Sequence, residues 1–175
     1  MRPAGPGPIL RRATEADVPT ILELIRGIAE YERLSHEVEA TEALLRRHGF
    51  GSRPIFEAIL AEVGGRAVGF ALYFFTFSTF KARPTLYLED LFVRPEERGR
   101  GFGRALLVEL GRIAVERECG RMEWSVLDWN EPARGFYFKL GAVAMDEWTV
   151  FRMTPEAFGR LARAGTAEGP RDEAM

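Results

Sequence analysis

The sequence predicts a mixed α/β domain of the α+β class, in which helices cover a mixed β-sheet. Strand-like segments follow one another in the middle of the chain, and strands then alternate with helices, an order that favours such a sheet. The 175 residues are 46% hydrophobic and 29% charged, which is the composition of an ordinary soluble globular protein. A glycine-rich turn over residues 98–103, between a strand-like and a helix-like segment, indicates a ligand site.

The N-terminal part is predicted to form a strand, two helices and a β-hairpin. Residues 1–8 hold three prolines and two glycines and are predicted to be a flexible tail. Thr14–Asp17 has the pattern of a capping box, which marks a helix start, and Gly64-Gly65 is a strong hairpin signal. The elements are a strand over Ile9–Arg12, a helix after Asp17 with Ile21, Leu24, Ile25 and Ile28 on one face, a helix over Thr41–Arg47 that ends at Gly49, and strands over Ile55–Val63 and Ala67–Thr76.

The C-terminal part is predicted to alternate between strands and helices. A loop over Lys81–Pro84 leads into an apolar strand, and the glycine turn leads from that strand into a helix. Gly141 is expected to end a later helix, and residues beyond Gly165 are expected to be disordered. The elements are strands over Leu86–Val93, Arg121–Leu127 and Glu147–Met153, and helices over Ala105–Ala114, Glu131–Leu140 and Pro155–Arg163.

Composition limits the partners and the compartment. A net charge of −2 argues against a nonspecific nucleic-acid surface. No apolar run approaches the length of a membrane span, and the N-terminus has no signal-peptide core. Cys119 is the one cysteine, which excludes an internal disulfide and fits a reducing cytoplasm. His36 and His48 are expected at the surface, so no metal site is predicted.

The turn over Arg98–Gly103 has the chemistry of a phosphate site. Glycines let the backbone approach a ligand closely, and the first N–H groups of the following helix are free to bind an anion. Gly103-Arg104-Ala105 lacks the Gly-Lys-Ser/Thr ending of a nucleotide P-loop, and the glycine spacing differs from the Rossmann fingerprint. The other interpretation is that these glycines only close a tight turn.

The pattern Arg98-x-x-Gly101-x-Gly103 resembles the pyrophosphate-binding motif of the GNAT superfamily of acetyl-CoA-dependent N-acetyltransferases. The predicted element order matches the GNAT (acyl-CoA N-acyltransferase) fold, which has a central, mostly antiparallel mixed sheet flanked by helices. The resemblance implies one domain over residues 9–164, between the tails 1–8 and 165–175. Further segments, from Ile9 to Arg152, resemble the spermidine/spermine (diamine) N-acetyltransferases: Ala29–Glu32, Val68–Thr76, Leu86–Val93, Asp128–Pro132 and Phe136-Tyr137.

The resemblance assigns a base and an acid. An alkyl ammonium group has a pKa of about 10.4 and must lose a proton before its nitrogen attacks a thioester. Glu89 lies where the family places its carboxylate base; the alternative is an ion pair with a neighbouring arginine. Alternation along the strand would send Asp90 to the opposite face, unless a β-bulge re-aims it. Tyr137 is the candidate general acid, or else packs like its aromatic neighbours.

The remaining candidate residues bind the two substrates. Asn130 suits the N-cap of its helix and in the family also contacts the CoA arm, whereas Lys139 either approaches the CoA phosphates or is a solvated surface residue. Glu32 is either a pocket carboxylate or a solvated charge, and Trp148 either lines the pocket or is core. The cofactor-binding candidates are Leu91, Phe92, Val93, Arg98, Gly99, Arg100, Gly101, Phe102, Gly103, Arg104, Asn130, Tyr137 and Lys139, and the substrate-binding candidates are Tyr31, Glu32, Glu89, Asp90 and Trp148.

One departure from the family bears on the substrate. Polyamine-specific members have an aspartate in the loop after the third strand, whereas this chain reads Phe77-Ser78-Thr79-Phe80-Lys81, which is more similar to the thialysine-acetylating branch. The sequence thus predicts a cytoplasmic, homodimeric enzyme that uses acetyl-CoA and no metal. It would acetylate a primary amine of a small diamine, polyamine or thialysine- or lysine-like substrate by direct attack in a ternary complex. A protein or peptide N-acetyltransferase and a non-catalytic acyl-CoA sensor are the alternatives.

Overall fold

A computed structural model describes residues 7–164 of the chain. The chain divides into two compact units, of which the first ends at Leu127 and the second begins at Asp128. The predicted C-terminal tail, 165–175, and most of the predicted N-terminal tail, 1–8, lie outside the described residues.

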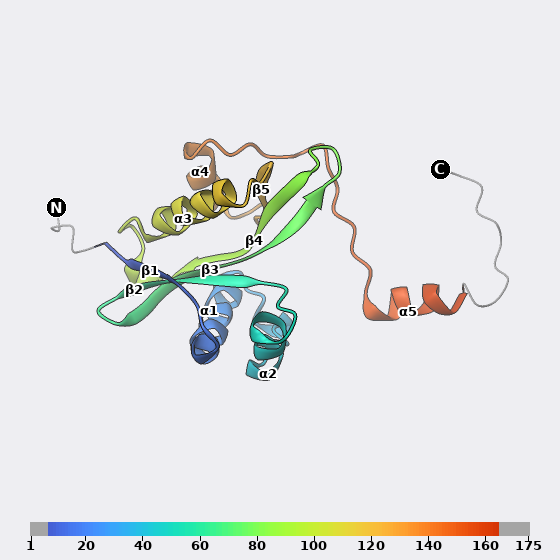
Figure 1. The fold of residues 1–175 in the computed structure, drawn as a ribbon, viewed down its shortest axis with the longest axis horizontal. Helices are drawn as coiled ribbons and strands as arrows, with labels where there is room; N and C mark the ends of the chain where they lie inside the picture. The colour runs from blue at the N-terminus through green and yellow to red at the C-terminus, as the bar shows by residue number, and fades with distance from the viewer. Residues whose placement is uncertain (1–6, 165–175) are drawn as a thin grey trace. The chain divides into compact units, whose positions relative to one another are not determined.

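The first unit is built on one mixed sheet (Figure 1). Its strands lie in the order β1-β2-β3-β4-β5, and each neighbouring pair is antiparallel except β4 and β5, which are parallel. The predicted mostly antiparallel mixed sheet is therefore confirmed. The strands are β1 (Ile9–Arg12), β2 (Glu57–Val63), β3 (Arg66–Ser78), β4 (Arg83–Val93) and β5 (Arg121–Trp124).

Helices cover both faces of this sheet, as Figure 1 shows for α1 and α2 below it and α3 above it. The helices are α1 (Val18–Tyr31), α2 (Glu42–Leu45) and α3 (Phe102–Glu116). On the α1 face, Ile21 and Leu24 are fully buried against Phe70 and Leu72 of β3. On the other face, Leu106 and Leu110 of α3 pack against Leu86 and Leu88 of β4. Burial of these apolar side chains drives the sheet and helices together.

The local turn signals account for the element boundaries. Gly64 and Gly65 have φ of 58° and 79°, the left-handed conformation that a two-residue hairpin between β2 and β3 needs. Helix α3 begins at Phe102 rather than at the predicted Ala105, because Gly101 with φ of 83° is its N-cap and the first turn is formed by the glycine motif itself.

The predicted helix over Thr41–Arg47 is shorter and does not end at Gly49. Thr41 caps α2 by accepting the Leu44 N–H at 3.2 Å, and a π-helical turn over Arg46–Phe50 follows α2 directly. A Cβ atom at Gly49 would lie 2.3 Å from the Phe56 ring. The glycine is therefore needed for close packing under Phe56 and not for helix termination.

The second unit contains α4 (Glu131–Lys139) and α5 (Pro155–Ala164), which agree with two predicted helices. The predicted strand over Glu147–Met153 is wrong. Glu147 lies in a turn in which the Trp148 N–H donates to the Met145 carbonyl at 3.3 Å, the rest of the segment forms no regular secondary structure, and no described strand pairs with it. A strand needs a neighbour for its backbone groups, and alternating apolar residues do not supply one. No helix within residues 7–164 is both long and apolar enough to cross a bilayer.

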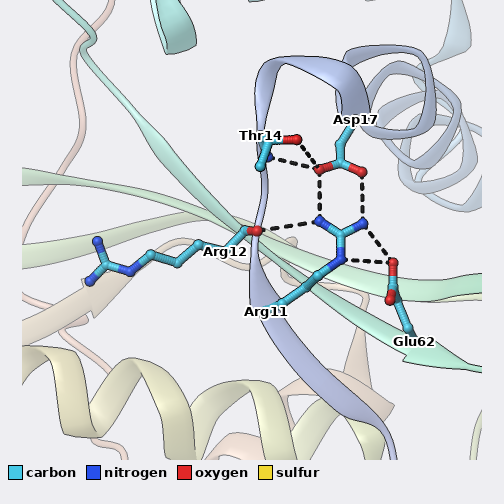
Figure 2. A network of polar contacts seen from close by, with 5 residues as sticks. All are labelled: Arg11, Arg12, Thr14, Asp17 and Glu62. Atoms are coloured by element: carbon cyan, nitrogen blue, oxygen red, sulfur yellow. Dashed lines mark hydrogen bonds and ion pairs between the residues drawn. The ribbon is translucent and has the colours of Figure 1, made fainter. Parts of the chain in front are cut away.

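A charged network fastens the start of α1 to the sheet (Figure 2). The Arg11 guanidinium donates to both carboxylate oxygens of Asp17 at 2.7 Å and to Glu62 of β2 at 2.6 and 3.0 Å. Asp17 also accepts the N–H and hydroxyl of Thr14 at 2.8 and 2.9 Å, which confirms the predicted capping box. These contacts hold the pKa of Asp17 far below its ordinary value near 3.8, the Arg11 hydrogen bonds being the largest cause.

Replacing Asp17 should cost stability in a pH-dependent way. We expect Asp17→Asn to lower the free energy of unfolding by about 1–3 kcal/mol at about pH 7, because it removes the bidentate ion pair and weakens the cap. Since the pKa of Asp17 is lowered in the folded state, its contribution is present above the ordinary value near 3.8 and is lost as the pH falls below it. Urea unfolding at about pH 7 and about pH 3 measures both effects.

The matched control is Glu15→Gln, which changes an exposed acidic residue of the same turn. We expect it to change the free energy of unfolding by less than about 0.5 kcal/mol at either pH. An Asp17→Asn variant as stable as the wild type at about pH 7 would contradict the role given to the network.

Candidate active site

A β-bulge in β4 turns two neighbouring carboxylates to the same face of the sheet. Leu88 pairs with Tyr73 of β3 and Asp90 pairs with Leu72, so Glu89 has no partner in β3. Leu88 before the bulge and Leu91 after it both pack on the α3 face. Alternation on either side therefore directs Glu89 and Asp90 to the α1 face. The bulge, which sequence analysis left open, corrects the opposite placement of Asp90 that simple alternation gives.

A third carboxylate, that of Glu32, lies near this pair. Glu32 is the C-cap of α1, and its pKa is raised by burial. Burial and the negative charges of Glu89 and Glu32 raise the pKa of Asp90 to about 7. We call Glu32, Glu89 and Asp90 the anionic cluster. It can attract an ammonium group, and it can take up a proton near neutral pH.

The glycine turn has the backbone geometry of an anion site. Gly99 and Gly101 have φ of 76° and 83°, which residues with a Cβ adopt only with strain. The first intrahelical bond of α3 runs from the Ala105 N–H to the Gly101 carbonyl at 2.9 Å. The N–H groups of residues 102–104 consequently have no intrahelical acceptor and point out of the positive end of the helix. This arrangement fits the pyrophosphate of a nucleotide cosubstrate.

The three arginines of the turn differ in what their side chains contact. Arg104 is exposed on the first turn of α3. Arg100 forms an ion pair with Glu97 and lies over the Phe102 ring at 4.8 Å. Arg98 reaches back to α1, where its guanidinium carbon lies 4.4 Å from the centre of the Tyr31 ring. Sequence analysis names all three as phosphate-binding candidates, and that role stays a prediction; the structure shows that their side chains have different surroundings.

The end of β4 leaves backbone groups for a ligand. Leu91, Phe92 and Val93 pair with Ala71, Phe70 and Gly69 of β3 on one side. On the other side β5 pairs only with Thr85–Leu88, so the ladder stops one residue before the bulge and the predicted strand to Leu127 ends at Trp124. Every second N–H after Asp90 therefore points to an edge that no described strand covers. Such N–H groups are suited to a carbonyl or an oxyanion.

The other predicted site residues belong to the second unit. Asn130 is the N-cap of α4 and accepts the Ala133 N–H at 3.3 Å, which confirms the capping half of its prediction. Tyr137 lies on α4 with its ring 5.4 Å from that of Phe136, and Lys139 is the last residue of the helix. Trp148 follows the turn after Met145. The ligand contacts of these four residues stay predictions.

The structure thus brings Tyr31, Glu32, Glu89, Asp90 and Arg98 together in the first unit. The contact between Tyr31 and Arg98 was missed by sequence reasoning, because the two residues are far apart in the chain and neither has a local signal for the other. Within residues 7–164 no group of three or more His, Cys, Asp or Glu side chains is arranged to hold a metal ion.

Comparison with known proteins decides the family. The model of the acetyltransferase (GNAT) family matches residues 19–142, which span β2, β3, the bulge of β4, the glycine turn and α4. The chain belongs to the GNAT family. It is accordingly an N-acetyltransferase, and the predicted fold is confirmed as a GNAT fold.

Curated relatives narrow the comparison within the GNAT family. Thialysine N-epsilon-acetyltransferase of Bos taurus is 40% identical over 88% of this chain and 96% of its own length. L-ornithine N5-acetyltransferase of Arabidopsis thaliana is 32% identical over 85% of both chains. Spermidine/spermine N(1)-acetyltransferase-like protein 1 of Homo sapiens is 36% identical over 84% of this chain but only 22% of its own length. Among solved structures, an integron cassette protein of V. cholerae is 25% identical, with a TM-score of 0.76 over 91% of this chain and 99% of that one.

The anionic cluster should lower stability at high pH. Because the pKa of Asp90 is raised to about 7 in the folded state, folding becomes less favourable as the pH rises from the ordinary value near 3.8 to about 7, and the cost is constant above that. We expect Asp90→Asn to be more stable than the wild type by about 1–3 kcal/mol at about pH 8 and equally stable at about pH 4. Urea unfolding at the two pH values measures the difference. An Asp90→Asn variant less stable at about pH 8 would contradict the unfavourable surroundings of this carboxylate.

Proposed function

We propose that this GNAT enzyme transfers the acetyl group of acetyl-CoA to a primary amine of a small diamine, polyamine or thialysine- or lysine-like substrate. The observation that carries the proposal is the anionic cluster on the α1 face of β4, in the same unit as the glycine turn. Three carboxylates with one pKa raised to about 7 repel one another, and a substrate with two positive charges would relieve that repulsion. A neutral or anionic acceptor would not.

The names of the relatives support the same class of acceptor. Two of them give thialysine and L-ornithine as the amines that those proteins acetylate, and the third describes its protein as similar to a spermidine/spermine N(1)-acetyltransferase. In this chain Glu32 of the cluster would hold the distal ammonium group of such an amine, while the face of Tyr31 would contact its methylene stem. The acceptor is thus defined by its charge and length more than by any one hydrogen bond.

Acetyl-CoA supplies a thioester-activated acetyl group, and the glycine turn fits its pyrophosphate. The N–H groups of residues 102–104 and the exposed Arg104 would hold the phosphates, and uncovered N–H groups after Asp90 would receive the acetyl carbonyl. Asn130 and Lys139 of the second unit are further candidates for contacts with CoA.

The cluster would also move the proton. The reacting ammonium group has a pKa of about 10.4, so its proton must pass to a base before its nitrogen attacks. Glu89 is exposed at the bulge and would accept that proton directly or through a water. The amine would then attack in a ternary complex, and Tyr137 would donate a proton to the departing sulfur. A homodimer and a cytoplasmic location stay predictions.

Activity toward a panel of amines, measured for the wild type and for a variant of the candidate base Glu89, tests the proposal. We expect CoA release from acetyl-CoA in the presence of thialysine or a short diamine, and much less with a peptide that offers only its N-terminus. We expect Glu89→Gln to lower kcat by about 10²–10⁴ near neutral pH, and by less at about pH 10, where the free amine becomes abundant. The measurement is thiol release with a colorimetric reagent across this pH range.

Glu30→Gln is the charge-matched control, because Glu30 is an exposed carboxylate beside Tyr31 on α1. It should leave kcat within about twofold of the wild type. Turnover of the peptide but not of any free diamine would favour a peptide acetyltransferase. Binding of acetyl-CoA with no turnover of any amine would favour a sensor, and either result would overturn the proposal.

The loop between β3 and β4 supports the proposal that the acceptor is a short amine. Ser78 is buried at the last pair of the hairpin, where it faces Arg83, and its Oγ accepts the Lys81 N–H at 3.3 Å. The resemblance implies an aspartate in this loop in polyamine-specific members of the family. This chain instead has the Ser78 hydroxyl group hydrogen-bonded within the turn and the cationic Lys81 after it. Both features disfavour a long polycation.

Restoring the negative charge should shift the substrate preference. We expect Ser78→Asp to raise kcat/KM for spermidine relative to thialysine by about two- to tenfold, because an added negative charge attracts the amine with the larger positive charge more strongly. The new side chain can still accept the Lys81 N–H, so the turn should form. Thr79→Asp adds the same charge at the next, exposed position and should change the ratio by less than about twofold. An unchanged ratio in Ser78→Asp would rule out this loop as a specificity element.

A further inference from the structure

Arg98 begins the glycine turn, yet its side chain is committed to other elements. Its Nε donates to the Val93 carbonyl at 3.0 Å. Its guanidinium carbon lies 4.4 Å from the centre of the Tyr31 ring and 5.7 Å from that of Phe92. A planar cation held over an aromatic face and anchored by a hydrogen bond has a defined position.

The ring under Arg98 lies at the end of α1, next to the anionic cluster. Tyr31 is the last residue of α1, Glu32 is its C-cap, and Arg33 follows with φ of 63°. The backbone at this point is held by the helix end, since the Glu32 N–H donates to the Ile28 carbonyl at 2.9 Å and the Leu34 N–H donates to the Ala29 carbonyl at 2.8 Å. The Arg98–Tyr31 stack adds a side-chain anchor at the residue before Glu32, whose charge acts on Asp90.

Arg104 provides the contrast within the same turn. Like Arg98 it is exposed, but it lies on the first turn of α3, beside the N–H groups that face a phosphate. The surroundings of Arg104 suit a residue that binds the acetyl donor. The surroundings of Arg98 suit a residue that positions groups of the amine pocket.

We propose that Arg98 is a positioning residue for the amine acceptor, which acts by holding Tyr31 and through it Glu32, and is not a phosphate ligand. The inference rests on the proposed function, because it needs an amine pocket at the anionic cluster. The first arginine of the glycine turn thus links the acceptor pocket to the turn that binds the donor.

The proposal and simple electrostatics give opposite expectations. Removing a positive charge near a cluster of carboxylates should by itself strengthen the binding of a cationic amine. If Arg98 positions Glu32, its removal should weaken amine binding instead. We expect Arg98→Met to raise the KM for the accepted amine by about three- to fivefold, while kcat at saturating amine and the Kd for CoA stay within about twofold.

Arg104→Met is the matched variant. It should raise the Kd for CoA, measured by isothermal titration calorimetry, and leave the KM for the amine unchanged at saturating acetyl-CoA. Arg98→Lys, which keeps the charge but loses the planar group, should raise the amine KM nearly as much as Arg98→Met. This second variant also covers the case in which Arg98→Met does not fold, as judged by circular dichroism.

A double-mutant cycle tests the path through Tyr31. Tyr31→Leu should raise the amine KM, and adding Arg98→Met to it should raise KM by less than about 1.5-fold more, because the stack is already gone. Independent, additive effects would overturn the proposal, and so would an amine KM that falls or stays the same in Arg98→Met. A loss of CoA affinity in Arg98→Met equal to that in Arg104→Met would make Arg98 a phosphate ligand after all.

The two proposals fail in different ways. If no amine of the panel is acetylated or bound, the proposed function fails, and the role of Arg98 fails with it. If amines are acetylated by the wild type but Arg98→Met changes only the Kd for CoA, the proposed function stands and the role of Arg98 alone is overturned.

Discussion

Because Glu89 has no partner in β3, the alternation of side chains along β4 resets between Leu88 and Leu91. Without that extra residue, one of the two neighbouring carboxylates would point into the α3 core, where an ionised group is not tolerated. The pairing of β4 with β5 ends at Leu88, immediately before the same residue. The unpaired residue therefore determines three features of the site. It directs both carboxylates to one face of the sheet, it lies where the uncovered edge of β4 begins, and it sets the register that places Phe92 beneath Arg98.

Much of the fold follows from local signals in the sequence. The capping box at Thr14 and Asp17, the Gly64-Gly65 turn and the apolar face of α3 each act over a few residues, and each appears as expected. The Glu147–Met153 segment has the alternation of a strand but has no strand beside it, since pairing is a property of the neighbour and not of the segment. Gly49 likewise looked like a helix stop, whereas the constraint comes from the Phe56 ring.

The same distinction between local signals and contacts with distant residues applies to the candidate site. The glycine turn could be predicted because its conformation depends on Gly99 and Gly101 themselves. Glu89, Asp90 and Glu32 were identified by resemblance, but their joint placement depends on a bulge, and a bulge is fixed by how β3 and β4 pair. The Arg98–Tyr31 stack joins a turn to a helix end and has no local signature at all. Sequence reasoning therefore recovers the residue types and misses which of them act on one another.

In the proposed function, the anionic cluster assigns amine binding and proton transfer to neighbouring residues. A carboxyl group with a pKa raised to about 7 is held there by burial and by two like charges, so any cation placed beside it lowers that pKa and favours the ionised form. Binding of a dicationic amine near neutral pH must then release protons from the cluster, by thermodynamic linkage. The same step leaves Asp90 ionised beside an ammonium group that has still to lose its proton. The repulsion that makes the free cluster unfavourable thus becomes affinity for a doubly charged amine.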